Sequence, residues 1–218
     1  MSTEPIADFF DRECCATADS ATSQIPGIDD VDRALVDALA EAGIAGGTVL
    51  ELGSGDGTLS RELVGRGAAA VSGVDLSPVS VEHATTAAAA AGIGDRLRYQ
   101  VGDASIAALV AHDTVVSERV FCCFPRPDGL LANTLPAARS IYALVLPESR
   151  GLAGLLTRFL VGVENTWRRL RREPFRAYVH DVRRIEQTIL AAGFERRTAQ
   201  RHWNWLLLVY RRTSLVSR

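Results

Sequence analysis

The stretch VLELGSGDGT (residues 49–58) places three glycines directly after a run of apolar residues. Glycine is used where the backbone must adopt a positive φ or approach another group closely, so this stretch predicts a ligand-binding turn. A P-loop ends in Gly-Lys-Ser/Thr, and the absence of lysine here excludes a triphosphate site of that kind. A dinucleotide-binding turn follows G-x-G-x-x-G/A, and Thr58 occupies its third glycine position. This mismatch counts against a nicotinamide-dependent oxidoreductase but leaves that alternative open.

Acidic residues accompany the glycines and the two strands expected after them. Glu51 lies two residues before Gly53, where its carboxylate would repel a pyrophosphate and attract an ammonium group. Asp75 ends the next expected strand, in a position to accept hydrogen bonds from both ribose hydroxyls. Asp103 ends the third expected strand, in a position to meet an adenine amino group. Together they predict a nucleoside with a cationic, amino-acid-like tail, which is S-adenosylmethionine.

The hydrophobic pattern indicates the elements that must position these residues. Strands are expected at 48–53, 69–76, 96–103, 113–118 and 140–146, and helices at 28–42, Leu59 to Val64, 79–91 and 181–193. This alternation predicts a parallel sheet with helices on both faces. Two last strands, 194–201 and 202–212, leave no room for a helix between them and must be antiparallel. The expected fold is therefore α/β, a Rossmann-like seven-stranded sheet with a reversed last strand, in a single domain over residues 1–218.

Four segments resemble the successive motifs of class I S-adenosylmethionine-dependent methyltransferases: VLELGSGDG, GVDLSP, VGDA and DTVVSERVFCCFP, within about residues 45–146. The resemblance implies an enzyme that moves a methyl group by in-line displacement to a small-molecule acceptor, leaving S-adenosylhomocysteine. It also implies which residues border the cofactor: Glu51, Gly53, Ser54, Gly55 and Gly57 at the methionine portion, Asp75, Leu76 and Ser77 at ribose and adenine, Asp103 and Ala104 at the adenine edge, and Glu118 near the sulfonium.

The stretch RVFCCFP, with FRAYVH further on, is similar to a branch of small bacterial methyltransferases grouped loosely with the magnesium-protoporphyrin O-methyltransferases. That porphyrin enzyme typically has a histidine before its Tyr-Pro. Here Cys123 precedes Phe124-Pro125, a departure that counts against a porphyrin acceptor.

The segment FRAYVH (175–180) supplies candidates for contact with the acceptor. If it is extended, Arg176, Tyr178 and His180 share one face. His180 is then a candidate base, Tyr178 orients the acceptor and Arg176 holds an anionic group; alternatively, His180 only caps the helix that follows. Arg119 is a second candidate for holding a carboxylate, and Cys122 is a candidate substrate contact or a packed small hydrophobe. A base is needed for a poorly ionised hydroxyl or amine but not for a carboxylate.

Two segments flank this framework as expected covers of the site. Residues 1–45 are expected to form an N-terminal helical lid, and residues 147–180 an inserted helical cap. Within the cap an apolar stripe has helical spacing: Leu152, Leu155, Leu156, Phe159, Leu160, Val163, Trp167 and Leu170. With its accompanying arginines the stripe is a surface helix packed on the domain, a lid over an apolar substrate, or a membrane-surface helix over 151–172.

The overall charge of −2 conceals an uneven distribution. Residues 1–109 carry 6 Arg against 17 Asp and Glu, and residues 110–218 carry 18 Arg against 9. The basic half leaves open a non-catalytic module that binds an anionic partner. Nucleic acid is disfavoured because no basic run interleaved with aromatics is present. The paired cysteines, Cys14-Cys15 and Cys122-Cys123, do not suit a zinc site and indicate free thiols in a cytoplasmic protein.

Overall fold

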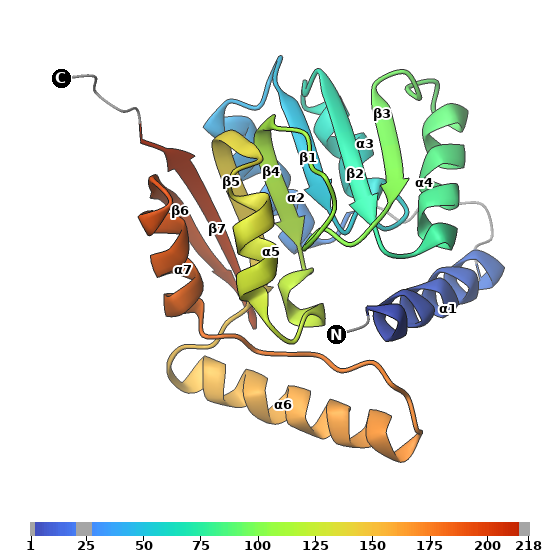
Figure 1. Cartoon of the computed structure of the whole chain (residues 1–218), viewed down its shortest axis with the longest axis vertical. Helices are drawn as coiled ribbons and strands as arrows, with labels where there is room; N and C mark the ends of the chain where they lie inside the picture. Colours follow the sequence, from blue (N-terminus) through green and yellow to red (C-terminus); the bar gives the residue numbers. More distant parts are fainter. Residues whose placement is uncertain (1–2, 21–27, 214–218) are drawn as a thin grey trace.

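A seven-stranded sheet in the order β3-β2-β1-β4-β5-β7-β6 forms the centre of the molecule. The computed structural model describes residues 3–20 and 28–213, without the side chains of residues 13–20, which include Cys14 and Cys15. The strands are β1 (Thr48–Leu52), β2 (Ala70–Asp75), β3 (Leu97–Val101), β4 (His112–Glu118), β5 (Ala138–Pro147), β6 (Phe194–His202) and β7 (Trp205–Arg212). Strand β7 is antiparallel to both of its neighbours, β5 and β6. The predicted Rossmann-like sheet with a reversed last strand is thereby confirmed (Figure 1).

Helices cover both faces of the sheet and bury its apolar side chains. The helices of the described residues are α1 (Glu4–Ser20), α2 (Asp30–Ala42), α3 (Thr58–Gly65), α4 (Pro78–Ala90), the short η1 (Phe121–Cys123), α5 (Pro127–Thr134), α6 (Gly151–Leu170) and α7 (Val182–Ala191). Leu35 of α2 and Leu63 of α3 belong to one core cluster. Leu131 of α5 and Ile185 of α7 belong to the other, on the opposite face of the sheet. Strands β1 and β5 are therefore covered on both sides, which explains their largely apolar sequences.

Local sequence signals account for several helix boundaries. The Asp29 side chain accepts hydrogen bonds from Val31 N and Asp32 N at the start of α2, and Gly43 ends this helix with φ of 89°. Ser77 caps α4, where Pro78 occupies the first turn. Two elements, η1 and α5, were not among those expected from the sequence. They are short, and the Phe-Pro-Arg-Pro stretch that joins them masks a helical pattern.

Helices α1 and α6 lie beyond the carboxyl ends of the parallel strands, away from the two helical layers (Figure 1). The apolar stripe of residues 152–170 does form a helix, as its spacing predicts. Its large side chains are exposed, however, so the stripe is not a face packed on the domain.

Among the helices of the described residues, none combines the length and apolar character needed to cross a membrane.

Candidate functional site

The glycine-rich turn joins β1 to α3 and has the backbone that its sequence predicts. Gly53, Gly55 and Gly57 all have positive φ, at 67°, 50° and 75°. A Cβ added at Gly53 would lie 2.4 Å from Cγ2 of Val120, so this position is closed to a side chain for steric reasons as well. The turn thus brings the backbone close to the segment that follows β4.

Asp75 fastens this turn to the end of β2. One carboxylate oxygen accepts a hydrogen bond from Gly55 N at 2.8 Å, and the other accepts from Ser77 N at 2.8 Å. Burial raises the pKa of Asp75, against the lowering effect of these backbone donors. Each carboxylate oxygen has a further lone pair, so Asp75 can still accept hydrogen bonds from a ligand.

An inner pocket of about 300 Å³ opens between these residues and helix α1. Many of the residues expected at the cofactor line it: Gly53, Gly55, Asp75, Leu76, Ala104 and Glu118. Ile6 and Phe10 of α1, with Val120, Cys123 and Phe124 of the fourth motif, complete an apolar wall; none of these five was among the residues expected to border the cofactor. The volume lies at the lower end of that of ordinary small-molecule sites.

Glu51 does not line the inner pocket, although its carboxylate was expected to point into it. It is 2% exposed and accepts a hydrogen bond from the Ser60 hydroxyl of α3. The alternation of side chains along β1 explains this: Leu50 and Leu52 pack in one core cluster, so Glu51 faces the other side, towards α3. Ser54, Gly57 and Ser77 also lie outside the pocket lining. Gly57 is the N-cap residue of α3, and Ser77 caps α4 and donates to Asp11 of α1.

Burial raises the pKa of Glu51 to about 8. The folded chain therefore keeps a proton on Glu51 that the unfolded chain loses near 4.5, and stability falls as the pH rises through this window. We expect Glu51→Gln to flatten this slope and to raise the free energy of unfolding by up to about 4 kcal/mol at about pH 8. Urea unfolding at several pH values measures this change, and the control is Glu62→Gln at an exposed glutamate of α3. If the stability of Glu51→Gln changed with pH as steeply as that of the unaltered chain, the raised pKa of Glu51 would be contradicted.

A cluster of carboxylates surrounds Arg119 at the rim of the inner pocket. Its Nη2 pairs with Asp29 and lies 3.9 Å from Asp32 Oδ1, and its Nε lies 2.8 Å from Glu118 Oε1. The ring of Trp205 lies beneath it, 5.1 Å from the guanidinium carbon. Arg119 thus lines the pocket with its charge already engaged, which leaves it poorly suited to hold an acceptor carboxylate. Burial raises the pKa of Glu118, and a cationic ligand beside it would favour its ionised form.

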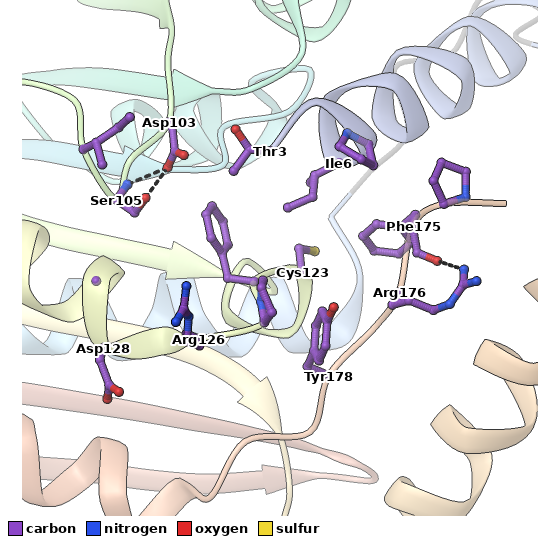
Figure 2. A pocket seen from close by; sticks show the side chains of 16 residues that line it. Thr3, Ile6, Asp103, Ser105, Cys123, Arg126, Asp128, Phe175, Arg176 and Tyr178 are labelled. Carbon is purple, nitrogen blue, oxygen red and sulfur yellow. Dashed lines mark hydrogen bonds between the residues drawn. The ribbon is translucent and has the colours of Figure 1, made fainter. Parts of the chain in front are cut away.

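An outer cavity of about 610 Å³ adjoins the inner pocket, because Ile6, Cys123 and Phe124 line both. Figure 2 shows it bordered by the N-terminal segment, the loop after β3, the η1–α5 segment and the chain after α6. Of the predicted site residues, Asp103, Arg176 and Tyr178 line it. Asp103 lies in this cavity and not in the inner pocket, and its Oδ1 accepts from Ser105 N at 2.8 Å.

Arg126 lines the outer cavity and has no charged or hydrogen-bonded partner among the described residues. The other charged side chains of the lining are engaged: Asp128 pairs with Arg184 at 2.9 Å, and Arg176 donates to the carbonyls of Glu173 and Phe175. In Figure 2 the Arg176 guanidinium turns towards Phe175, away from Tyr178. The sequence expectations missed Arg126, although its position just after FCCFP was a usable signal.

His180 and Cys122 do not line the outer cavity but stabilise its wall through hydrogen bonds. His180 Nε2 donates to the carbonyls of Phe121 and Phe124, at 2.9 and 2.8 Å. The helix cap proposed for His180 is wrong, because Asp181 caps α7. The Cys122 thiol donates to the Arg119 carbonyl at 3.0 Å, and its neighbour Cys123 is the cysteine that lines both cavities. Both are free thiols.

Comparison with known proteins adds independent information. Residues 49–139 match the family model described as a methyltransferase domain. No match is found among curated protein sequences. The domain match supports the enzyme expected from the sequence and decides against the nicotinamide-dependent oxidoreductase.

Solved structures with this fold are numerous and distant in sequence. Magnesium protoporphyrin IX methyltransferase from Synechocystis PCC 6803, with bound S-adenosylhomocysteine, is 19% identical; the match covers 97% of this chain and 100% of that one, with a TM-score of 0.72. A sarcosine dimethylglycine methyltransferase, so named provisionally, from Galdieria sulphuraria is 13% identical over 84% of this chain and 85% of that one, with a TM-score of 0.67. The cyclase SpnF is 15% identical over 97% of both chains, with a TM-score of 0.67. Residues 49–139 thus match a methyltransferase domain, and the chain has the fold of the class I S-adenosylmethionine-dependent methyltransferases.

Proposed function

We propose that the chain transfers the methyl group of S-adenosylmethionine to a largely apolar small molecule that carries a carboxylate. The observation that carries this proposal is the guanidinium of Arg126, which has no charged or hydrogen-bonded partner among the described residues and lies in an otherwise mostly apolar cavity that shares a wall with the inner pocket. Arg126 is exposed, and its guanidinium offers paired N–H donors that match the two oxygens of a carboxylate.

The inner pocket suits the cofactor. Asp75 offers carboxylate lone pairs to ribose hydroxyls, while Leu76 and Ala104 supply apolar surface for a base. Glu118 and the nearby Asp32 place negative charge at the rim, which favours a ligand that carries sulfonium and ammonium charges. Glu51 lies behind the glycine turn, so we propose that it supports this turn and does not contact the ligand.

The outer cavity suits the acceptor. When bound, S-adenosylmethionine supplies an electrophilic methyl group whose bond to sulfur breaks as the bond to the acceptor oxygen forms. The chain's own task is to hold the acceptor oxygen in line and to exclude water. Arg126 holds the anionic end, and Tyr178 and Phe175 contact the apolar body. A carboxylate is already ionised and needs no base, which agrees with His180 being bonded to two backbone carbonyls. We assign His180 as a positioning residue for the Phe121–Phe124 turn.

Helix α1 is proposed as a lid over both spaces. Ile6 lines both, Phe9 stacks on Phe175 with ring centroids 4.3 Å apart, and Ser77 bonds Asp11. Release of α1 would open the inner pocket and the outer cavity together, because the same helix closes each of them.

Substitution of Arg126 tests the acceptor assignment. We expect Arg126→Gln to raise the KM for a carboxylate acceptor about 10- to 100-fold with little change in the affinity for S-adenosylhomocysteine, because a charged hydrogen bond contributes about 1.5–3 kcal/mol. The assay measures transfer of labelled methyl to a panel of hydrophobic carboxylic acids and their matched amides. Arg98→Gln, at an exposed arginine of β3 away from both spaces, is the control. Methylation of the amides but not the acids, or an unchanged KM in Arg126→Gln, would contradict the proposal.

A further inference from the structure

Helix α6 presents an apolar face that no described part of the chain covers. All eight large side chains of its stripe are exposed, from 40% for Leu160 to 86% for Leu152. Figure 1 shows the helix standing off the sheet, beyond its carboxyl edge. Exposure of so much contiguous apolar surface marks an interaction site in a soluble fold.

The orientation of α6 is set by its opposite side. Gly154 and Thr157 are buried, and further along Asn165 bonds both Ala177 N and Ala177 O, at 3.0 and 2.8 Å. Arg168 lies over the rings of Phe9 and Phe175, at 4.6 and 5.1 Å. At 100° per residue these four positions fall on one side of the helix, so the stripe on the other side points away from the domain.

The flanks of the apolar face are positively charged. Arg158, Arg169, Arg171 and Arg172 are exposed around it or just beyond it. Arg171 lies over the ring of Trp167 at 4.8 Å. The acidic residue of the helix, Glu164, is already paired with Arg168 at 2.6 Å. The face therefore combines Leu, Phe and Trp with arginines whose charge is not balanced locally.

We propose that α6 docks the chain on an anionic lipid surface, lying in the plane of the membrane with its apolar face buried among the acyl chains. Charge complementarity selects this occupant over a second copy of the chain. Two α6 faces brought together would set arginine against arginine, with Glu164 already engaged. Anionic headgroups, in contrast, balance the flanking arginines while the acyl chains cover the stripe.

The docked orientation also places the outer cavity near the lipid. The chain leaving α6 supplies Pro174, Phe175 and Tyr178 to the cavity lining. An acceptor dissolved in the membrane would then reach the site with a short path through water. This consequence rests on the proposed function, whereas the membrane docking itself does not.

Vesicle flotation tests the docking, with binding measured separately from methyl transfer. We expect the chain to float with vesicles of phosphatidylcholine and phosphatidylserine, to bind phosphatidylcholine alone much more weakly, and to dissociate as salt is raised. Arg158→Gln with Arg169→Gln should weaken binding about 25-fold, since each basic side chain near an anionic surface contributes about a factor of five. Leu155→Glu with Phe159→Glu should abolish it.

Val110→Glu is the matched control, because Val110 is 73% exposed just before β4, at the opposite edge of the sheet. It should float like the unaltered chain, and circular dichroism should show all variants folded. Failure to float with phosphatidylserine vesicles, or equal loss in Val110→Glu, would overturn the proposal. A dimer that light scattering detects and that Leu155→Glu with Phe159→Glu dissociates would assign the face to a second copy and would overturn it too.

Discussion

Replacing Asp75 with alanine is expected to lower the affinity for S-adenosylhomocysteine at least about a hundredfold. The carboxylate holds the glycine turn through Gly55 N, bonds Ser77 N at the start of α4, and faces the inner pocket. Its removal costs the ligand two hydrogen bonds to a charged acceptor, each contributing about 1.5–3 kcal/mol, and frees the turn as well. Titration calorimetry measures the loss directly.

Asp56→Ala is the control for this experiment, because Asp56 lies in the same turn but is exposed, and among the described residues its side chain accepts a hydrogen bond from Thr58 N alone. It should bind S-adenosylhomocysteine nearly as well as the unaltered chain. If Asp75→Ala kept full affinity while folded, the inner pocket would not be the cofactor site. The membrane docking of α6 would be untouched by that result, since its readout involves no cofactor.

Replacing Gly154 with alanine is expected to lower the free energy of unfolding by about 3 kcal/mol or more. A Cβ at this position would lie 2.1 Å from the carbonyl carbon of Ser149 and 2.3 Å from its oxygen, so backbone must move. The Ser149 hydroxyl in turn accepts from Val182 N at 3.0 Å, which couples the start of α6 to the start of α7. Displacement of α6 would therefore loosen α7 as well.

Gly162→Ala in the same helix should have the opposite sign. An added Cβ there meets nothing within 4 Å, and alanine favours a helix over glycine by up to about 1 kcal/mol. Urea unfolding of both variants measures the contrast. Equal stability of the two variants would show that α6 is not seated against Ser149.

Local signals in the sequence were sufficient for most of the fold. The apolar runs at 48–53 and 69–76 could only be buried strands, and the short connection before Trp205 required an antiparallel pair. The helix α5 escaped prediction because an eight-residue helix between prolines has too few turns to show a period.

The candidate site was predictable to a lesser extent, because motifs give positions along the chain and not directions in space. Gly53, Gly55 and Asp75 lie at the carboxyl ends of neighbouring parallel strands, so the backbone alone brings them to the inner pocket. Glu51 sits in the same motif, but the face of β1 on which it falls depends on which core cluster takes Leu50 and Leu52.

The sequence by itself thus determined the class of fold, the turn with three positive-φ glycines, and the helical period of residues 152–170. These follow from φ preferences and hydrophobic periodicity, which act between near neighbours. Only the tertiary structure decided that Arg119 lies among three carboxylates while Arg126 has no partner among the residues that the structure describes. It alone also decided that α6 turns its apolar face outward. The pairing of charges and the direction of a helix face depend on residues that are far apart in the chain. Their distances in space are set only when the helices pack on the sheet.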